Sequence, residues 1–319
     1  RMLLEEVVTL DEFILASILA ACAEMKDLTT GRHVHILIVV YFLPLDVVLV
    51  NAIINMYVKC AHLEDASFML DGMNEKMEAT WNAVISGYVQ NDKAQKAITY
   101  YLQMMMEVAL PNNVTFISVI SACTDRTFLY QGKQMHAHLS CIGGENKLDD
   151  DLVLVNTLIN MYGKCGSLCN ALVMFNLKAY KDVVSWNAVI GAAALNGYGK
   201  LALELFDRMI VEGKKPNSIT YICLLFACNF AGCLDEGKHV FVTMGEFGIK
   251  HSFDHHACLI DLLGRVGLMD EAEGLIDLMP FGYVDVAWVC ILGACNIHND
   301  IERGIKAANH CFQTNPEHC

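Results

Sequence analysis

Apolar residues recur at intervals of three and four along most of the chain, in short stretches separated by polar or glycine-containing breaks. The segment 80–106 is typical: one helical stripe covers 80–90, residues 91–92 interrupt it, and a second stripe covers 94–105. The apolar positions of the first stripe are Trp81, Val84, Ile85 and Tyr88. Most of the chain is therefore expected to form short helices that follow one another in pairs.

The pairs of stripes return at a fixed distance. The segment Asn51–Cys60 recurs as Asn156–Cys165, 105 residues later and with 7 of 10 positions identical. A second segment, Cys123–Gly132, recurs 105 residues later, but its earlier copy lies 101 residues upstream, so the middle unit holds about four extra residues. Because 105 is three times 35, three related units of about 35 residues alternate, and they must stack to bury their apolar faces.

The composition favours a packed protein over a disordered or membrane-spanning one. Of the 319 residues, 55% are hydrophobic and 18% charged, with a mean hydropathy of +0.37, whereas disordered chains show the opposite balance. Pro44 and Asp46 break the densest apolar stretch, 36–50, which is shorter than the roughly 20 residues of a membrane span. The first residues show no targeting segment. The 14 cysteines form no Cys-x-x-Cys pair and are expected to be reduced, packed thiols.

The unit motifs resemble the pentatricopeptide repeat family, specifically the plant subclass in which long, short and standard units alternate. Long units carry Ala-Cys and Gly-Lys/Arg-x-x-His/Phe, short units carry Asn-Met-Tyr-x-Lys-Cys, and standard units carry Trp-Asn-Ala-Val-Ile. On this resemblance the long units are 12–46, 113–151 and 218–252, the short units 47–77, 152–182 and 253–284, and the standard units 78–112 and 183–217. Residues 1–11 resemble the tail of an earlier unit, and 285–319 resemble a truncated extension motif that follows the last repeat.

The resemblance implies a fold, a partner and a location. The fold is an all-α, right-handed superhelical solenoid of about nine stacked helix-turn-helix units. Members of this subclass are typically organellar RNA-binding proteins, most often specificity factors for C-to-U RNA editing. The implied partner is single-stranded RNA of the mitochondrion or chloroplast, with a deaminase domain or editing partners in trans and no cofactor.

The resemblance also implies which residues read bases, namely the fifth and the last residue of a unit, at one base per unit. An Asn at the fifth position offers both a donor and an acceptor to a base edge. The fifth residues of the short and standard units are Asn51, Asn82, Asn156 and Asn187, and the corresponding last residues are Met77, Asn112, Asp182 and Asn217. A lone Asn is commonly a capping or loop residue, but four in register make that reading less convincing.

By the same resemblance, Asn82/Asn112 and Asn187/Asn217 read pyrimidines and Asn156/Asp182 reads uracil. The unit closed by Met77 is poorly determined. The long units carry Ala16, Ile117 and Ile222 at the fifth position, where no hydrogen bond to a base is possible. Small apolar residues at the second position could sandwich bases between units; these are Val48, Ala79, Val153 and Val184.

The net charge of −14 argues at first against a polyanionic partner. The repeat alignment changes this, because many acids, such as Glu64 and Glu271, fall in second helices of the pairs. Lys59, Lys164 and Arg265 share one site near the end of the first helix, where stacked units would line them up for a phosphate backbone. The alternative for these three cations is a solvated helix C-terminus, which also favours positive charge. The overall acidity predicts modest, salt-sensitive binding.

Metal and enzyme chemistry are not expected. The stretch 251–258 and the pair His136/His138 look like ligand sets, but the aligned long units place His35, His136 and Phe241 at one site, which is packing behaviour. A deaminase would need His-x-Glu followed by Pro-Cys-x-x-Cys, and this combination does not occur. The chain is therefore expected to hold no metal and not to be an enzyme.

Two alternatives stay open. A protein-interaction scaffold of the tetratricopeptide type has helix pairs of similar shape, but its repeat runs to 34 residues throughout. The rotation of unit lengths and the Asn residues in register favour RNA. The other alternative is a non-functional gene fragment, for which the Met77 closure and the extra residues before Asp151 are the arguments.

Overall fold

The computed structural model describes residues 12–41, 46–177, 179–277, 279 and 284–314, which form helices joined by short turns. The expected repeat tail at 1–11 and the end of the extension motif at 315–319 lie outside the described residues. No strand occurs in the described ranges, and the expected all-α class of stacked helix-turn-helix repeats is confirmed. The chain divides into two compact halves, Arg1–Gly144 and Glu145–Cys319, and each is described by itself.

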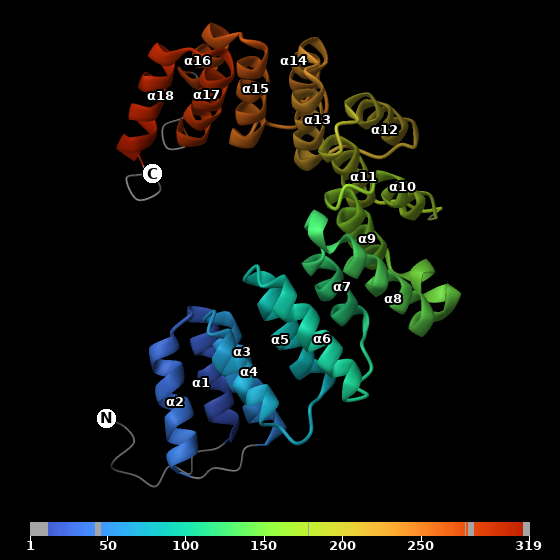
Figure 1. Ribbon diagram of the computed structural model, residues 1–319, viewed down its shortest axis with the longest axis vertical. Coiled ribbons are helices and arrows are strands. Elements are labelled where there is room, and N and C mark those ends of the chain that lie inside the picture. The colour runs from blue at the N-terminus through green and yellow to red at the C-terminus, as the bar shows by residue number, and fades with distance from the viewer. Residues whose placement is uncertain (1–11, 42–45, 178, 278, 280–283, 315–319) are drawn as a thin grey trace. The chain divides into compact units, whose positions relative to one another are not determined.

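In the N-terminal half, first and second helices alternate along the chain (Figure 1). The first helices are α1 (Glu12–Met25), α3 (Val47–Lys59), α5 (Glu78–Gln90) and α7 (Asn113–Ala122). The second helices are α2 (Leu28–Val40), α4 (Leu63–Asp71), α6 (Ala94–Met106) and α8 (Leu129–Asp150), whose last residues pass into the C-terminal half. Each first helix packs on the next first helix, and α2, α4 and α6 each pack between two of them.

The C-terminal half repeats this arrangement (Figure 1). Its first helices are α9 (Leu152–Lys164), α11 (Val183–Leu195), α13 (Ser218–Ala231), α15 (Phe253–Val266) and α17 (Val284–His298). Its second helices are α10 (Leu168–Leu177), α12 (Gly199–Val211), α14 (Leu234–Thr243), α16 (Met269–Asp277) and α18 (Ile301–Thr314). The first helices therefore form a continuous row from α9 to α17.

Large apolar side chains and close backbone contacts hold neighbouring helices together. Trp81 on α5 and Trp186 on α11 are fully buried. Gly163 lets α9 approach α11, because a Cβ at this position would lie only 2.5 Å from the Cβ of Ala192. The row of first helices is thus packed tightly enough that individual positions tolerate only glycine.

Most turns between paired helices contain a residue in the left-handed backbone conformation. In the C-terminal half this is usually a glycine, for example Gly166 with φ 82°, while Asn299 with φ 57° takes this place between α17 and α18. The equivalent of Gly166 in the N-terminal half, 105 positions earlier, is Ala61 with φ 61°, which is unfavourable for a residue with a Cβ. The four extra residues of the long unit 113–151 lie on a helix of 22 residues, α8, compared with 13 residues in α2.

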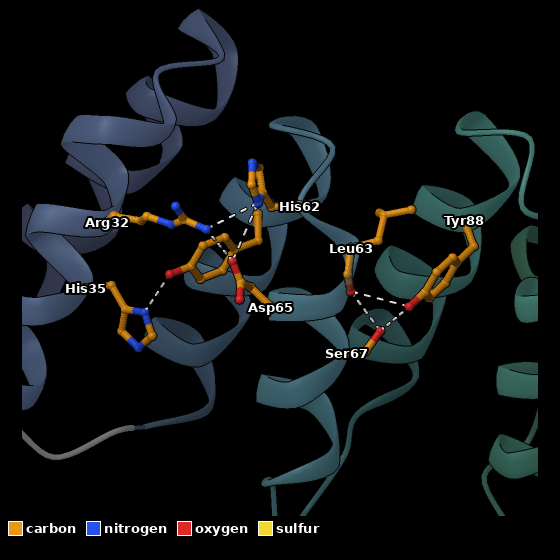
Figure 2. Close-up of polar contacts among 8 residues, drawn as sticks. Arg32, His35, His62, Leu63, Asp65, Ser67 and Tyr88 are labelled. Carbon is orange, nitrogen blue, oxygen red and sulfur yellow. Dashed lines mark hydrogen bonds and ion pairs between the residues drawn. The ribbon is translucent and has the colours of Figure 1, made fainter.

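Ion pairs link successive second helices. Arg32 on α2 contacts Asp65 on α4 at 2.8 Å (Figure 2), and Glu64 on α4 contacts Lys96 on α6 at 2.6 Å. In the C-terminal half, Lys238 on α14 contacts a carboxylate of α16 at 2.7 Å. Each exposed pair stabilises the fold only slightly. The acidic residues involved are nevertheless neutralised by cations of the adjacent second helix.

The described residues contain no helix long and apolar enough to cross a membrane. Thirteen cysteines lie in this part of the chain, and none of them forms a disulfide bond there. Within the same ranges, no group of three His, Cys, Asp or Glu side chains could hold a metal ion. The aligned histidines are packed: burial lowers the pKa of His35 and of His136, and the ring of Phe241 lies 4.2 Å from that of His251.

Candidate nucleic-acid interface

The last residue of a standard unit caps the next first helix. The Asn112 side chain accepts a hydrogen bond from the Thr115 N–H at 2.9 Å, and the Asn112 N–H donates to the Thr115 hydroxyl at 3.1 Å. Asn217 and Thr220 form the same reciprocal capping box at the start of α13. Short polar side chains cap helices well because they satisfy the free N–H groups of the first turn.

The last residues of the short units differ from each other. Asp182 caps α11 by accepting a hydrogen bond from the Ser185 N–H at 2.8 Å. Burial acts to raise the pKa of the Asp182 carboxyl, but hydrogen bonds from Ser185 and Asn156 hold it below its ordinary value. Met77 precedes α5 without any side-chain capping bond. The unit that ends at Met77 therefore has no polar last residue.

The fifth and last residues of a unit, far apart in sequence, are direct hydrogen-bond partners. Asn187 Nδ2 donates to Asn217 Oδ1 at 3.0 Å, and Asn82 Nδ2 donates to Asn112 Oδ1 at 3.3 Å. The third pair is longer, with 3.4 Å between Asn156 Nδ2 and an Asp182 carboxylate oxygen. The three pairs named from the sequence are thus each brought together by the stacking of successive first helices.

An apolar groove opens beside the Asn187–Asn217 pair. It encloses about 330 Å³ and is lined by residues of α9, α11 and α13 together with Asn217. Val184 and Ile219 line it and are 55% and 56% exposed. Such a groove suits a flat, partly polar ring as a ligand. The two branched side chains can cover the faces of the ring while the amide pair forms hydrogen bonds with its edge.

The other second-position residues are exposed but do not line this groove. Val48 and Val153 are exposed on the first turns of α3 and α9, and Ala79 is exposed on that of α5. None of these three lines the groove that holds Val184. Ile219 was missed by the sequence reasoning, although it is the second residue of its unit and so matches Val184 in register.

The three aligned cations have different surroundings. Lys59 on α3 is ion-paired with Glu24 on α1, and Arg265 on α15 is paired with Asp261 at 2.9 Å. Lys164 lines the groove together with Asn187 and pairs with no carboxylate among the described residues. Lys164 is therefore the best-placed of the three to meet a phosphate.

Comparisons with known proteins identify the family of the repeats. A family model described as PPR repeat family matches residues 181–229, and one described as PPR repeat matches residues 79–107 and 257–280. Pentatricopeptide repeat-containing protein At1g11290, chloroplastic, of Arabidopsis thaliana is 35% identical over 302 residues, which are 94% of this chain and 37% of that protein. The chain belongs to the pentatricopeptide repeat family.

Further members of the pentatricopeptide repeat family match at similar levels. The Arabidopsis thaliana proteins CRR2, chloroplastic, and At2g03880, mitochondrial, are 33% and 36% identical and cover 96% and 95% of the chain. The chain spans 47% of the length of each. The resemblance seen in the sequence is thus confirmed for the family, while the alternation of three unit types stays a prediction.

Solved pentatricopeptide repeat structures share the fold. The crystal structure of PPR10 from maize superposes with a TM-score of 0.63 at 22% identity, over 88% of this chain and 42% of that chain. The structure of PPR10 in complex with an 18-nt psaJ RNA element gives a TM-score of 0.65. At this level of identity the similarity concerns the fold.

Proposed function

We propose that the chain binds single-stranded RNA and reads one base at each pair of fifth and last residues. The observation that supports this most directly is the Asn187–Asn217 hydrogen bond, which lies beside an apolar groove walled by Val184 and Ile219. A base would enter this groove with its faces covered by the two apolar side chains and its edge against the amides. Lys164, on the same groove, would contact the backbone phosphate.

The pairs differ in the bases that they would accept. Asn82/Asn112 and Asn187/Asn217 consist of amides, which present both donors and acceptors, and we assign a pyrimidine to each. Asn156/Asp182 contains a carboxylate, which only accepts, and uracil has the ring N–H donor that it needs. Asn51 has Met77 as its last residue and is left without an assigned base.

The wider role is that of an organellar RNA-processing factor. The relatives named above as chloroplastic and mitochondrial support an organellar location for this chain as well. A specificity factor for C-to-U editing is the role that we assign, with RNA binding in this chain and deamination by a domain or protein other than these repeats. The chain itself would then bind RNA without catalysing a reaction.

The central experiment measures binding of short RNAs to the whole chain. One RNA carries a pyrimidine opposite unit 78–112, any base opposite 113–151, uracil opposite 152–182 and a pyrimidine opposite 183–217. This RNA is made with the four bases in 5′-to-3′ order and also in the reverse order. A second RNA has purines at the three assigned positions. We expect the first to bind at least about tenfold more tightly in one direction, since three hydrogen-bonded contacts of about 1 kcal/mol each are at stake. Equal affinity for both RNAs would contradict base reading.

The variant Asp182→Asn tests the uracil assignment. Because Asn can donate as well as accept, the preference for uracil over cytosine at that nucleotide is expected to fall about three- to tenfold, towards equality. Preferences at the other nucleotides should stay the same, and Asn still caps α11. Titrations with RNAs that differ only at this nucleotide measure the ratio.

A matched control is Asp151→Asn. Asp151 caps α9 and is the last residue of a long unit, where the fifth residue is Ile117 and no base is read. This control should change no base preference. A general loss of RNA binding in Asp182→Asn, with uracil still preferred, would contradict the assignment.

A further inference from the structure

Three of the four fifth-position Asn side chains each accept a hydrogen bond from a buried threonine hydroxyl. In each case the threonine is the third residue of the next first helix. Thr115 Oγ1 donates to Asn82 Oδ1 at 2.6 Å, and Thr220 Oγ1 donates to Asn187 Oδ1 at 2.6 Å. Thr80 Oγ1 donates to Asn51 at 2.5 Å in the same way.

The remaining fifth-position residue, Asn156, lacks this contact with the next first helix. The third residue of that helix is Ser185, whose hydroxyl donates to the Asp182 carboxylate at 2.8 Å. A hydroxyl has one hydrogen, and a carboxylate is a stronger acceptor than an amide. Asn156 is only 5% exposed, and its Oδ1 is consequently left buried and without a hydrogen-bond partner among the described residues.

The two situations leave different groups available for a ligand. At Asn187, the hydroxyl of Thr220 holds Oδ1 while Asn217 holds one N–H, so the amide cannot turn over and its second N–H is the group left to donate. At Asn156, only the amide nitrogen is held. Oδ1 has no partner among the described residues and no accessible surface, so a base can donate to it only after the side chain rotates. An unpaired buried acceptor gains free energy when a ligand donates to it.

We propose that the third residue of α7, α11 and α13 is a positioning residue for base recognition by the preceding unit. The inference rests on the proposed RNA-binding function. Thr115 and Thr220 fix Asn82 and Asn187 as donors to a pyrimidine carbonyl oxygen. Ser185 leaves Asn156 and Asp182 to act together as acceptors, which suits the ring N–H of uracil.

The variant Thr220→Val tests the proposal, because valine keeps the shape of threonine but removes the hydroxyl. RNAs with each of the four bases opposite Asn187/Asn217 are titrated against the whole chain. The preference for pyrimidine over purine at that nucleotide is expected to fall about three- to tenfold. The uracil preference at the neighbouring Asn156/Asp182 nucleotide should be unchanged. Thr220→Ser, which keeps a hydroxyl, is expected to retain most of the preference.

Thr220 also takes part in the capping box of α13, so a loss of stability has to be separated from a loss of selectivity. Ser252→Ala is the matched control, since Ser252 caps α15 at a junction where the preceding fifth residue is Ile222. It should lower the melting temperature by about 2–4 °C without changing any base preference.

The possible outcomes separate the inference from the proposed function. If Thr220→Val stays folded and keeps the full pyrimidine preference, Thr220 is a capping residue alone and the inference is wrong. If Ser252→Ala changes base preferences as much as Thr220→Val, the effect is one of stability and the inference is wrong. If the unmodified chain shows no preference at any nucleotide, base reading itself is wrong, and this is seen before any variant is made.

Discussion

Replacing Trp186 with alanine is expected to lower the free energy of unfolding of the C-terminal half by about 3–5 kcal/mol. The indole is fully buried on α11, with the ring of Phe175 at 4.8 Å and the Arg208 guanidinium at 5.7 Å. Because α11 packs on both α9 and α13, a cavity at this point weakens two repeat interfaces. Urea denaturation followed by circular dichroism measures the loss.

The matched control for Trp186→Ala is Leu177→Ala. Leu177 lies on the adjacent helix α10 but is 60% exposed, so its replacement should change stability by no more than about 0.5 kcal/mol. A second variant, Trp186→Phe, should cost much less than alanine, since the buried indole N–H has no hydrogen-bond partner in the described part of the chain. Similar losses for Trp186→Ala and Leu177→Ala would contradict the packing argument.

Replacing Lys164 with glutamate is expected to weaken RNA binding about tenfold or more. A charged hydrogen bond to phosphate contributes about 1.5–3 kcal/mol, and the new carboxylate repels the backbone. The slope of log affinity against log salt concentration should also fall by about 0.7, the value of one phosphate contact on a single strand. Filter binding or fluorescence anisotropy at several salt concentrations gives both quantities.

Lys200→Glu makes the same change of charge at a different surface. Lys200 is an exposed residue of the second helix α12 and does not line the groove. It should leave both the affinity and the salt dependence close to those of the unmodified chain. If both variants weaken binding equally, the effect of Lys164 is one of net charge, and its contact with phosphate is contradicted.

The local elements of the fold were predictable because they depend on nearby residues. The apolar stripe predicted a helix over 80–90, and α5 covers Glu78–Gln90. The second stripe predicted 94–105, and α6 covers Ala94–Met106. The left-handed turn at Ala61 was not predictable from that residue type, and its only signal is the glycine at the aligned position, Gly166.

The candidate site was predictable only in part, because its contacts join neighbouring units. Register alone indicated that Asn187 and Asn217 belong together. The hydroxyl of Thr220 lies 33 residues from Asn187, and only the packing of α13 on α11 shows that they meet. Lys59, Lys164 and Arg265 occupy the same position in the repeat alignment. Arg265, however, has Asp261 one helical turn away on its own helix, and this difference could have been seen in the sequence.

On the proposed function, the last residue of each reading unit serves two requirements at once. Asn112, Asp182 and Asn217 begin a helix, and helix starts favour a narrow set of side chains, mainly Asn, Asp, Ser and Thr. Helix initiation would therefore limit which side chains can be used for base recognition at this position. Replacing Asn217 with a long or cationic side chain would lose about 1 kcal/mol of local stability through the lost helix cap. Replacing Asn187 would lose no cap, but it would leave the buried hydroxyl of Thr220 without this acceptor.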